Sequence, residues 1–153
     1  MLRDDVDEFF EMRPREDSPY MLLVAPVRAD KRCDVRDNGA TGLEKLKQLR
    51  STIPAITHVD YSARVQTVDA TRHPRFHRIL QSMKERTGCP VVINTSFNVR
   101  GEPIVRSPED AYRCFMATNM DVLVIGQFLL KKDEQPKAER YEIDEYLAQF
   151  QLD

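Results

Sequence analysis

Short apolar runs alternate along this chain with stretches of helical periodicity, and that order constrains the fold more than any other feature of the sequence. Three runs are continuous and bounded by turn-forming or polar residues, which is typical of buried strands: residues 20–27, 90–93 and 121–130. A fourth segment, residues 62–68, alternates as a half-buried strand does, with Ala63, Val65 and Thr67 on one side. The sequence therefore predicts four strands.

Two helices are predicted among these strands. After residue 74, apolar residues recur at i, i+3, i+4 and i+7 and define one face of a helix that ends at Gly88: Phe76, Ile79, Leu80 and Met83. A second helix begins at Ser107, where a serine cap is followed by proline and, three residues after the cap, by Asp110. This order predicts an α/β fold of mixed α+β character, with a twisted, partly parallel open sheet flanked by helices.

Length and composition describe an ordinary globular protein. The chain has 153 residues, of which 41% are apolar and 31% charged, so we expect one domain, over residues 1–133, and an acidic tail, residues 134–153, that forms a final helix packed on it. No apolar run reaches the ~18 residues of a membrane span, and the acidic start is unlike a signal peptide. The three cysteines have no metal-pair spacing: Cys33, Cys89 and Cys114. We expect reduced thiols, a cytoplasmic location and no metal site formed by this chain.

The net charge of −2 conceals an uneven distribution. Residues 1–17 and residues 134–153 each carry a net charge of −4, whereas residues 28–106 hold fifteen bases and eight acids, a net charge of +7. A basic middle indicates an anionic ligand. A solvated basic surface would give the same composition.

Residues 94–103 are the strongest candidate for a ligand site. They read Asn-Thr-Ser-Phe-Asn-Val-Arg-Gly-Glu-Pro and lie between a predicted strand and a capped helix, where open α/β sheets place ligands. The short polar side chains offer hydrogen bonds, and Arg100 offers a planar cation that suits phosphate or carboxylate. Gly101 permits a backbone conformation that other residues avoid. The alternative is a polar turn that caps its own backbone.

Arg64 and His58 form a second group of candidates. An arginine within a mainly apolar strand either faces an anion-binding cavity or pairs with a nearby acid, here Asp60 or Asp69. His58 and Asp60 have the spacing of a proton relay, although a hydrogen-bonded histidine at a strand end is the simpler interpretation.

A basic cluster around residues 72–78 suggests a nucleic-acid surface only weakly. It contains Arg72, His73, Arg75, His77 and Arg78. At helical spacing these residues define the solvated face opposite Leu80, and aromatic residues are not interleaved among them as in single-strand binders. We therefore expect no nucleic-acid partner.

Several of these segments resemble the C-terminal domain of O-carbamoyltransferases of the NodU and TobZ type. The resemblance covers residues 1–132 and is carried by HVDYSARVQTV (58–68), by PVVINTSFNVRGEPIVRSPEDAYRCF (90–115) and by MDVLVIGQFLL (120–130). The run from Thr95 to Asn98 followed by Gly101-Glu102-Pro103 is also similar to the segment with which YrdC proteins hold nucleotide and anionic substrate. The resemblance implies a single YrdC-like domain.

This resemblance implies a reaction. The domain would bind carbamoyl phosphate and ATP, with Mg²⁺ on the nucleotide, and make carbamoyl-adenylate while releasing pyrophosphate and phosphate. A separate N-terminal domain with an actin-like fold and a bound metal would then transfer the carbamoyl group to a hydroxyl acceptor. Because both reactants are polyanions, such a site must neutralise charge and align them, and it needs no protein nucleophile.

Residue roles follow from the same resemblance. We expect Arg64 and Ser96 to contact the reacting oxyanions as the catalytic pair. The predicted substrate- and nucleotide-binding residues are Asn94, Thr95, Asn98, Arg100 and His58.

Two departures from the family favour an alternative. The long N-terminal domain is absent from this sequence, and Tyr61 occupies a position where a small residue, commonly glycine, is usual. Whether the chain acts alone as an enzyme is therefore open. The alternative is a non-catalytic docking or anion-binding module whose apolar residues near the two ends contact a partner or another copy of the chain: Val6, Phe9, Phe10, Tyr146 and Phe150.

Overall fold

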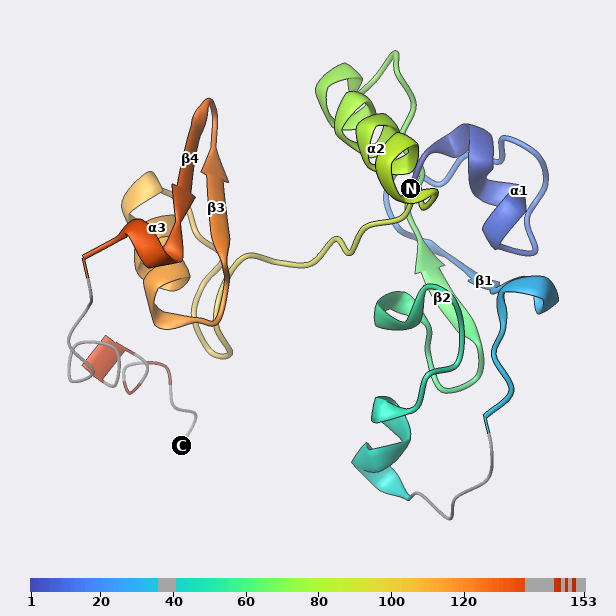
Figure 1. The fold of residues 1–153 in the computed structure, drawn as a ribbon, viewed down its shortest axis with the longest axis horizontal. Helices are drawn as coiled ribbons and strands as arrows, with labels where there is room; N and C mark the ends of the chain where they lie inside the picture. Colours follow the sequence, from blue (N-terminus) through green and yellow to red (C-terminus); the bar gives the residue numbers. More distant parts are fainter. Residues whose placement is uncertain (36–40, 137–144, 147, 149, 151–153) are drawn as a thin grey trace. The chain divides into compact units, whose positions relative to one another are not determined.

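The computed structural model describes residues 1–35, 41–136, 145, 146, 148 and 150, and these form a mixed α+β structure (Figure 1). Its helices are α1 (Val6–Phe9), α2 (Pro74–Thr87) and α3 (Pro108–Ala117). Its strands are β1 (Leu23–Pro26), β2 (Ser62–Val65), β3 (Val122–Ile125) and β4 (Phe128–Lys131). The chain divides into two compact units, Met1–Ile93 and Asn94–Asp153.

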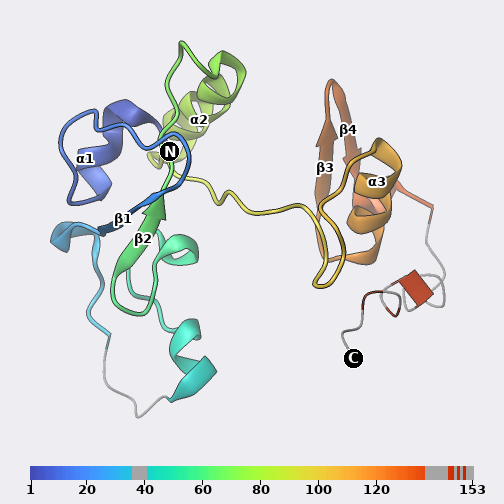
Figure 2. The ribbon, with the colours of Figure 1, turned by 180° about the vertical axis from the view of Figure 1, so that it is seen from behind.

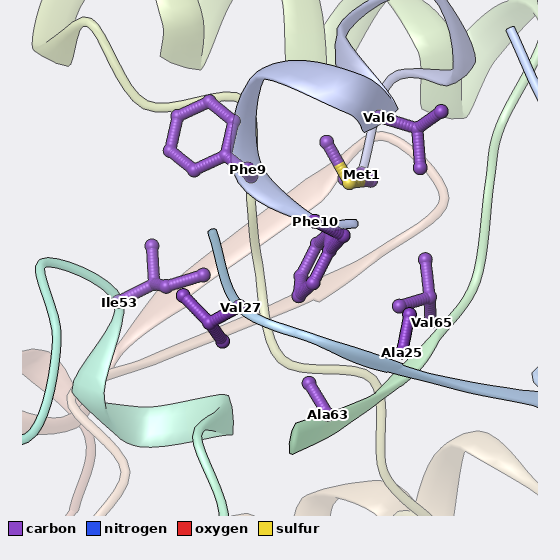
Figure 3. Packing of buried hydrophobic residues seen from close by; sticks show 9 residues of the cluster. All are labelled: Met1, Val6, Phe9, Phe10, Ala25, Val27, Ile53, Ala63 and Val65. Carbon is purple, nitrogen blue, oxygen red and sulfur yellow. The ribbon is translucent and has the colours of Figure 1, made fainter. Parts of the chain in front are cut away.

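The first unit has its core on one face of the β1–β2 pair. These strands are antiparallel, in a register that pairs Leu23 with Val65 and Pro26 with Ser62. The predicted alternation is confirmed in part, because Ala63 and Val65 are buried and Arg64 is exposed. The strand ends at Val65 rather than at residue 68, and Ser62 and Val68, expected on the face of Arg64, are also buried. Figure 3 shows the main cluster gathered around Phe10, which lies just after α1. Each large apolar side chain buried in this way stabilises the fold by about 1.5–3 kcal/mol.

The same cluster corrects one expectation from the sequence. Val6, Phe9 and Phe10 are buried within the first unit, with no more than 8% of their surface exposed. They are thus core residues rather than exposed contacts for a partner, which removes most of the evidence for a docking module.

Helix α2 follows its sequence signals closely. It begins with Pro74 at its first position and ends at Gly88, whose φ of 75° gives the left-handed C-cap. Leu80 is fully buried against Leu2 and Val68. The predicted apolar face is only partly buried, since Ile79 is 62% exposed.

In the second unit, helix α3 packs against a β-hairpin. Ser107 accepts a hydrogen bond from the N–H of Asp110, and Asp110 completes the capping box, as predicted. Phe115 of α3 and Leu123 of β3 share a buried cluster. Residues 121–130, predicted as one strand, instead form β3 and β4 in an antiparallel pair. The chain reverses after Ile125, where Gly126 has a φ of 61°, a conformation that tight hairpin turns require.

The expected partly parallel open sheet is not found among the described residues. Both ladders there are antiparallel and two-stranded, and parallel pairing is limited to an isolated bridge between Leu2 and Val68. Residues 90–93, predicted as a strand, join no ladder, and Figure 2 shows the chain after α2 as plain extended backbone. Val91 and Val92 are partly buried against the two clusters of the first unit without pairing their backbones, whereas Ile93 is 57% exposed.

The limits of the domain remain a prediction. Most of the acidic tail, including residues 137–144, lies outside the described residues, so a boundary at residue 133 and a tail helix are not tested. Over the described part of the chain, every helix is too short or too polar to cross a membrane.

Candidate functional site

The polar segment 94–103 opens the second unit and leads toward helix α3. Asn94, Thr95 and Ser96 are exposed. Phe97 anchors the segment, because its side chain packs on the cluster around Phe115 and its carbonyl oxygen accepts a hydrogen bond from the Val105 N–H at 3.0 Å. The predicted catalytic residue Ser96 therefore lies on an exposed stretch directly before an anchored residue.

A tight turn forms the centre of this segment. The N–H of Glu102 donates to the carbonyl of Val99 at 3.1 Å, and Gly101, the third residue of the turn, has a φ of 86°. A positive φ at this position is the signature of a type II turn and favours glycine. The Glu102 carboxylate accepts from the Val99 N–H at 2.9 Å, which closes the turn a second time.

Asn98 holds the same turn from inside. Its side-chain nitrogen donates to the carbonyl oxygens of Val99 at 2.9 Å and Glu102 at 2.8 Å. Both amide hydrogens are thereby committed to the backbone, as the polar-turn interpretation anticipates. Within the described part of the chain, the amide oxygen of Asn98 is left to accept a hydrogen bond from a ligand.

This construction presents Arg100 at the tip of the turn. Arg100 is exposed, and among the described residues it makes no ion pair and no side-chain hydrogen bond. A permanently charged guanidinium on a turn held by four hydrogen bonds can bind an anion without first leaving an internal partner.

Glu102 connects the turn to two other parts of the second unit. Its second carboxylate oxygen accepts a hydrogen bond from the hydroxyl of Tyr146. Burial, together with the nearby negative charge of Glu102, raises the pKa of the Cys114 thiol in α3. Sequence analysis placed Glu102 in the Gly101-Glu102-Pro103 run without giving it a role, and it considered Tyr146 only as an apolar contact for a partner. The 44 positions between them hid their hydrogen bond from any local pattern.

Arg64 lies on the exposed face of β2. Its guanidinium donates to the carbonyl oxygen of Met21 at 3.1 Å. Asp60 and Asp69, considered from the sequence as ion-pair partners, bond instead to Ser62 and to Arg72. Within the described residues Arg64 keeps its charge without a carboxylate partner, which agrees with a role in holding an anion.

His58 and Asp60 are joined through Ser62 rather than directly. The Ser62 hydroxyl donates to Asp60 at 2.7 Å and so accepts from Nδ1 of His58 at 3.0 Å. The hydroxyl and backbone N–H of Ser62 hold the pKa of Asp60 below its usual value. This is a turn stabilised by side chains at the start of β2, and His58 is exposed.

The structure thus places the predicted residues in two groups. Arg64 and His58 belong to the first unit, on β2 and the turn before it, and the other five belong to the segment that opens the second unit. That all seven line one pocket remains a prediction.

Other surfaces attract less interest as sites. In the basic cluster, Arg75 and Arg78 are exposed on α2, whereas Arg72 precedes the helix and is committed to ion pairs with Asp17 and Asp69. A hollow of about 560 Å³ between α1 and the start of the segment after β1 contains none of the predicted residues. In the described part of the chain, no three His, Cys, Asp or Glu side chains gather as metal ligands would.

Comparison with known proteins covers nearly the whole chain. Residues 1–132 match a family model described as the carbamoyltransferase C-terminus. An uncharacterised protein of Synechocystis is 48% identical over 100% of this chain. The nodulation protein NolNO of Sinorhizobium fredii is 38% identical over 86% of it.

One similar protein is named for its reaction. The 3'-hydroxymethylcephem-O-carbamoyltransferase of Amycolatopsis lactamdurans is 31% identical over 84% of this chain. The chain spans only 25% of the length of that protein, 25% of the Synechocystis protein and 17% of NolNO. The similarity is therefore to one part of much longer proteins.

Proposed function

The chain belongs to the carbamoyltransferase C-terminal family, and from this premise we propose that it binds carbamoyl phosphate and Mg-ATP and forms carbamoyl-adenylate. The carbamoyl group then passes to a hydroxyl acceptor on a separate N-terminal part of the enzyme, which has an actin-like fold and its own metal. The chain spans a quarter or less of its relatives, so it supplies one half-reaction of an O-carbamoyltransferase. A YrdC-like relationship and a cytoplasmic location, where both phosphorylated substrates occur, belong to the same proposal.

The observation that carries the proposal is the turn at residues 99–102. It holds Arg100 exposed and without an ion pair among the described residues, and its geometry depends on Asn98, Gly101 and Glu102. A charged fork on a prearranged loop suits a phosphate group, because little conformational freedom is lost when the ligand binds.

The proposed chemistry needs positive charge and alignment. Carbamoyl phosphate and water give carbamate and phosphate, and a carbamate oxygen then displaces pyrophosphate from the α-phosphorus of ATP. Negative charge accumulates on the phosphoryl oxygens, and Mg²⁺ bound to the nucleotide neutralises part of it. Arg64 and Ser96 contact the reacting oxyanions, while Arg100 holds a phosphate group. The remaining predicted residues form hydrogen bonds to the two substrates: Asn94, Thr95, Asn98 and His58.

Calorimetric titration with carbamoyl phosphate and, separately, with Mg-ATP tests the proposal. We expect Arg64→Ala and Arg100→Ala each to weaken binding of at least one ligand by about tenfold or more, as loss of a charge-assisted hydrogen bond does. Ser96→Ala should slow pyrophosphate release more than it weakens binding. Arg78→Ala, on the solvated face of α2, serves as the matched control and should bind normally.

Two outcomes would contradict this account in different ways. Normal binding by both arginine variants would remove these residue assignments while leaving the activity. A wild-type chain that is folded but binds neither ligand would contradict the proposal that this part of the enzyme holds the site.

A further inference from the structure

We propose that Tyr146 is a positioning residue for the turn that presents Arg100, so that residues beyond the family-matched region set the affinity of the anion site. This inference rests on the proposed function, because it concerns the same site. It concerns Tyr146 and Phe150, both of which are described by the structure and partly buried.

The connection runs through the carboxylate of Glu102. One of its oxygens accepts the Tyr146 hydroxyl, and the other accepts the Val99 N–H at 2.9 Å, inside the turn. Tyr146 therefore restrains the Glu102 carboxylate, and that carboxylate is hydrogen-bonded to the backbone of the turn that positions Arg100.

Phe150 adds a second restraint on the same turn. Its ring meets that of Tyr146 edge to face, with 5.2 Å between centroids and an interplanar angle of 73°. The Phe150 backbone lies so close to Gly101 that a Cβ atom at residue 101 would overlap its carbonyl oxygen. Gly101 is thus required twice, once for its φ and once for this contact.

The protonation of the pair suits a lasting hydrogen bond. Burial and the bond to Glu102 raise the pKa of Tyr146, so the phenol remains a donor throughout the neutral range. Without that hydroxyl, a partly buried carboxylate oxygen would lose its donor, and the carboxylate would be free to turn away from Val99.

The contact between Tyr146 and Glu102 involves a residue outside the region that the family shares. The family model ends at residue 132, and NolNO and the cephem O-carbamoyltransferase align with 86% and 84% of the chain, whereas the Synechocystis protein aligns with all of it. A residue beyond the family region is placed to adjust the site rather than to perform the common reaction.

Tyr146→Phe tests the proposal, because it removes the hydroxyl and keeps the ring against Phe150. Two measurements are made on the full chain: amide hydrogen exchange at Val99 and Glu102, and calorimetric binding of carbamoyl phosphate. We expect faster exchange at Val99 and an affinity about fivefold lower, as for loss of one hydrogen bond, with the melting temperature nearly unchanged. Tyr20→Phe, at a tyrosine that is 79% exposed, is the matched control and should alter neither measurement.

The Arg100→Ala background distinguishes positioning from general loosening. There, Tyr146→Phe should cause no further loss of affinity, since the side chain that it positions is gone. Unchanged exchange at Val99 together with unchanged affinity would overturn the proposal, as would an equal affinity loss in the Arg100→Ala background. If the wild-type chain binds no carbamoyl phosphate, the proposed function fails, and exchange at Val99 alone still decides whether Tyr146 positions the turn.

Discussion

A left-handed backbone marks each of the two groups of predicted site residues. Tyr61, between His58 and Arg64, has a φ of 63°, and Gly101 has a φ of 86°. A residue with a side chain pays about 1–2 kcal/mol for this conformation. The Tyr61 ring lies 5.6 Å from the Arg32 guanidinium, and that contact offsets part of the strain.

Gly101→Ala should destabilise the second unit more than a substitution at a glycine where only the positive φ is unfavourable. Its alanine Cβ would carry the positive-φ penalty and also overlap the Phe150 carbonyl, so we expect a loss of about 1–3 kcal/mol. Gly126→Ala is the control, since Gly126 has a φ of 61° with open space around it, and it should lose about 1 kcal/mol. Chemical denaturation measures both, and equal losses would contradict the contact with Phe150.

At the scale of single residues, the sequence predicts those contacts that form between residues close together in the chain. Arg100, Asn98 and Gly101 lie in one short segment, and their turn could be anticipated from residue types alone. Glu102 gains its second partner from Tyr146, and no local pattern reports a bond between residues that far apart. Arg64 left two interpretations open, because residue spacing does not show which neighbouring acids are engaged elsewhere.

Among the elements, helices were predicted better than strands. The capping box of α3 and the glycine C-cap of α2 are encoded within a few residues, so the sequence specifies where these helices begin or end. An apolar run alone specified neither burial nor a hydrogen-bonding partner, since Val24, Val124 and Phe128 are each more than 60% exposed. Residues 90–93 join no ladder among the described residues, with Pro90 buried but Ile93 57% exposed, and residues 121–130 divide at Gly126 into a hairpin.

Ser107→Ala should weaken helix α3 by about 1 kcal/mol. The substitution removes the acceptor for the Asp110 N–H and breaks the capping box. A fall in the midpoint of urea denaturation of the second unit checks this, with Asn119→Ala, at an exposed position beyond the same helix, as the control. An unchanged midpoint for Ser107→Ala would show that the cap contributes nothing.

The hydrogen-bonded carboxylate of Asp69, just before α2, should stabilise the first unit in a way that is lost at acid pH. Backbone N–H groups of Arg72 and Thr71 and the Arg72 side chain hold the pKa of Asp69 at about 2, below its unfolded value near 4. Because the folded pKa is depressed, this contribution is complete above pH 4 and is lost as the pH falls toward 2.

Asp69→Asn therefore should destabilise the first unit at pH 7 and have a much smaller effect near pH 2. Denaturation midpoints measured between these pH values test the trend, with the exposed Asp34→Asn as the control. A wild-type to variant difference that stays constant over the whole range would contradict the assignment.

For the whole molecule, the structure shows which of the charged residues counted in the composition form ion pairs. The acidic first segment neutralises part of the basic middle through ion pairs: Asp5 with Lys84 at 2.7 Å, Glu11 with Arg32 at 2.9 Å and Asp17 with Arg72 at 2.6 Å. Arg64 and Arg100 are not consumed in this way among the described residues. These ion pairs remove Lys84, Arg32 and Arg72 from the positive charge that the sequence offered for an anion.

The most direct test of the central claim is thermal unfolding of the chain with and without saturating carbamoyl phosphate and Mg-ATP. A ligand at 100 times its dissociation constant adds about 2.7 kcal/mol, which for roughly 150 residues raises the melting temperature by about 5–11 °C. The account predicts a rise of this size in the wild type, a rise about half as large or smaller in Arg100→Ala, where tenfold weaker binding leaves about 1.4 kcal/mol of stabilisation or less, and the full rise in Arg78→Ala. A cooperatively folded wild-type chain whose melting temperature does not respond to either ligand would contradict it.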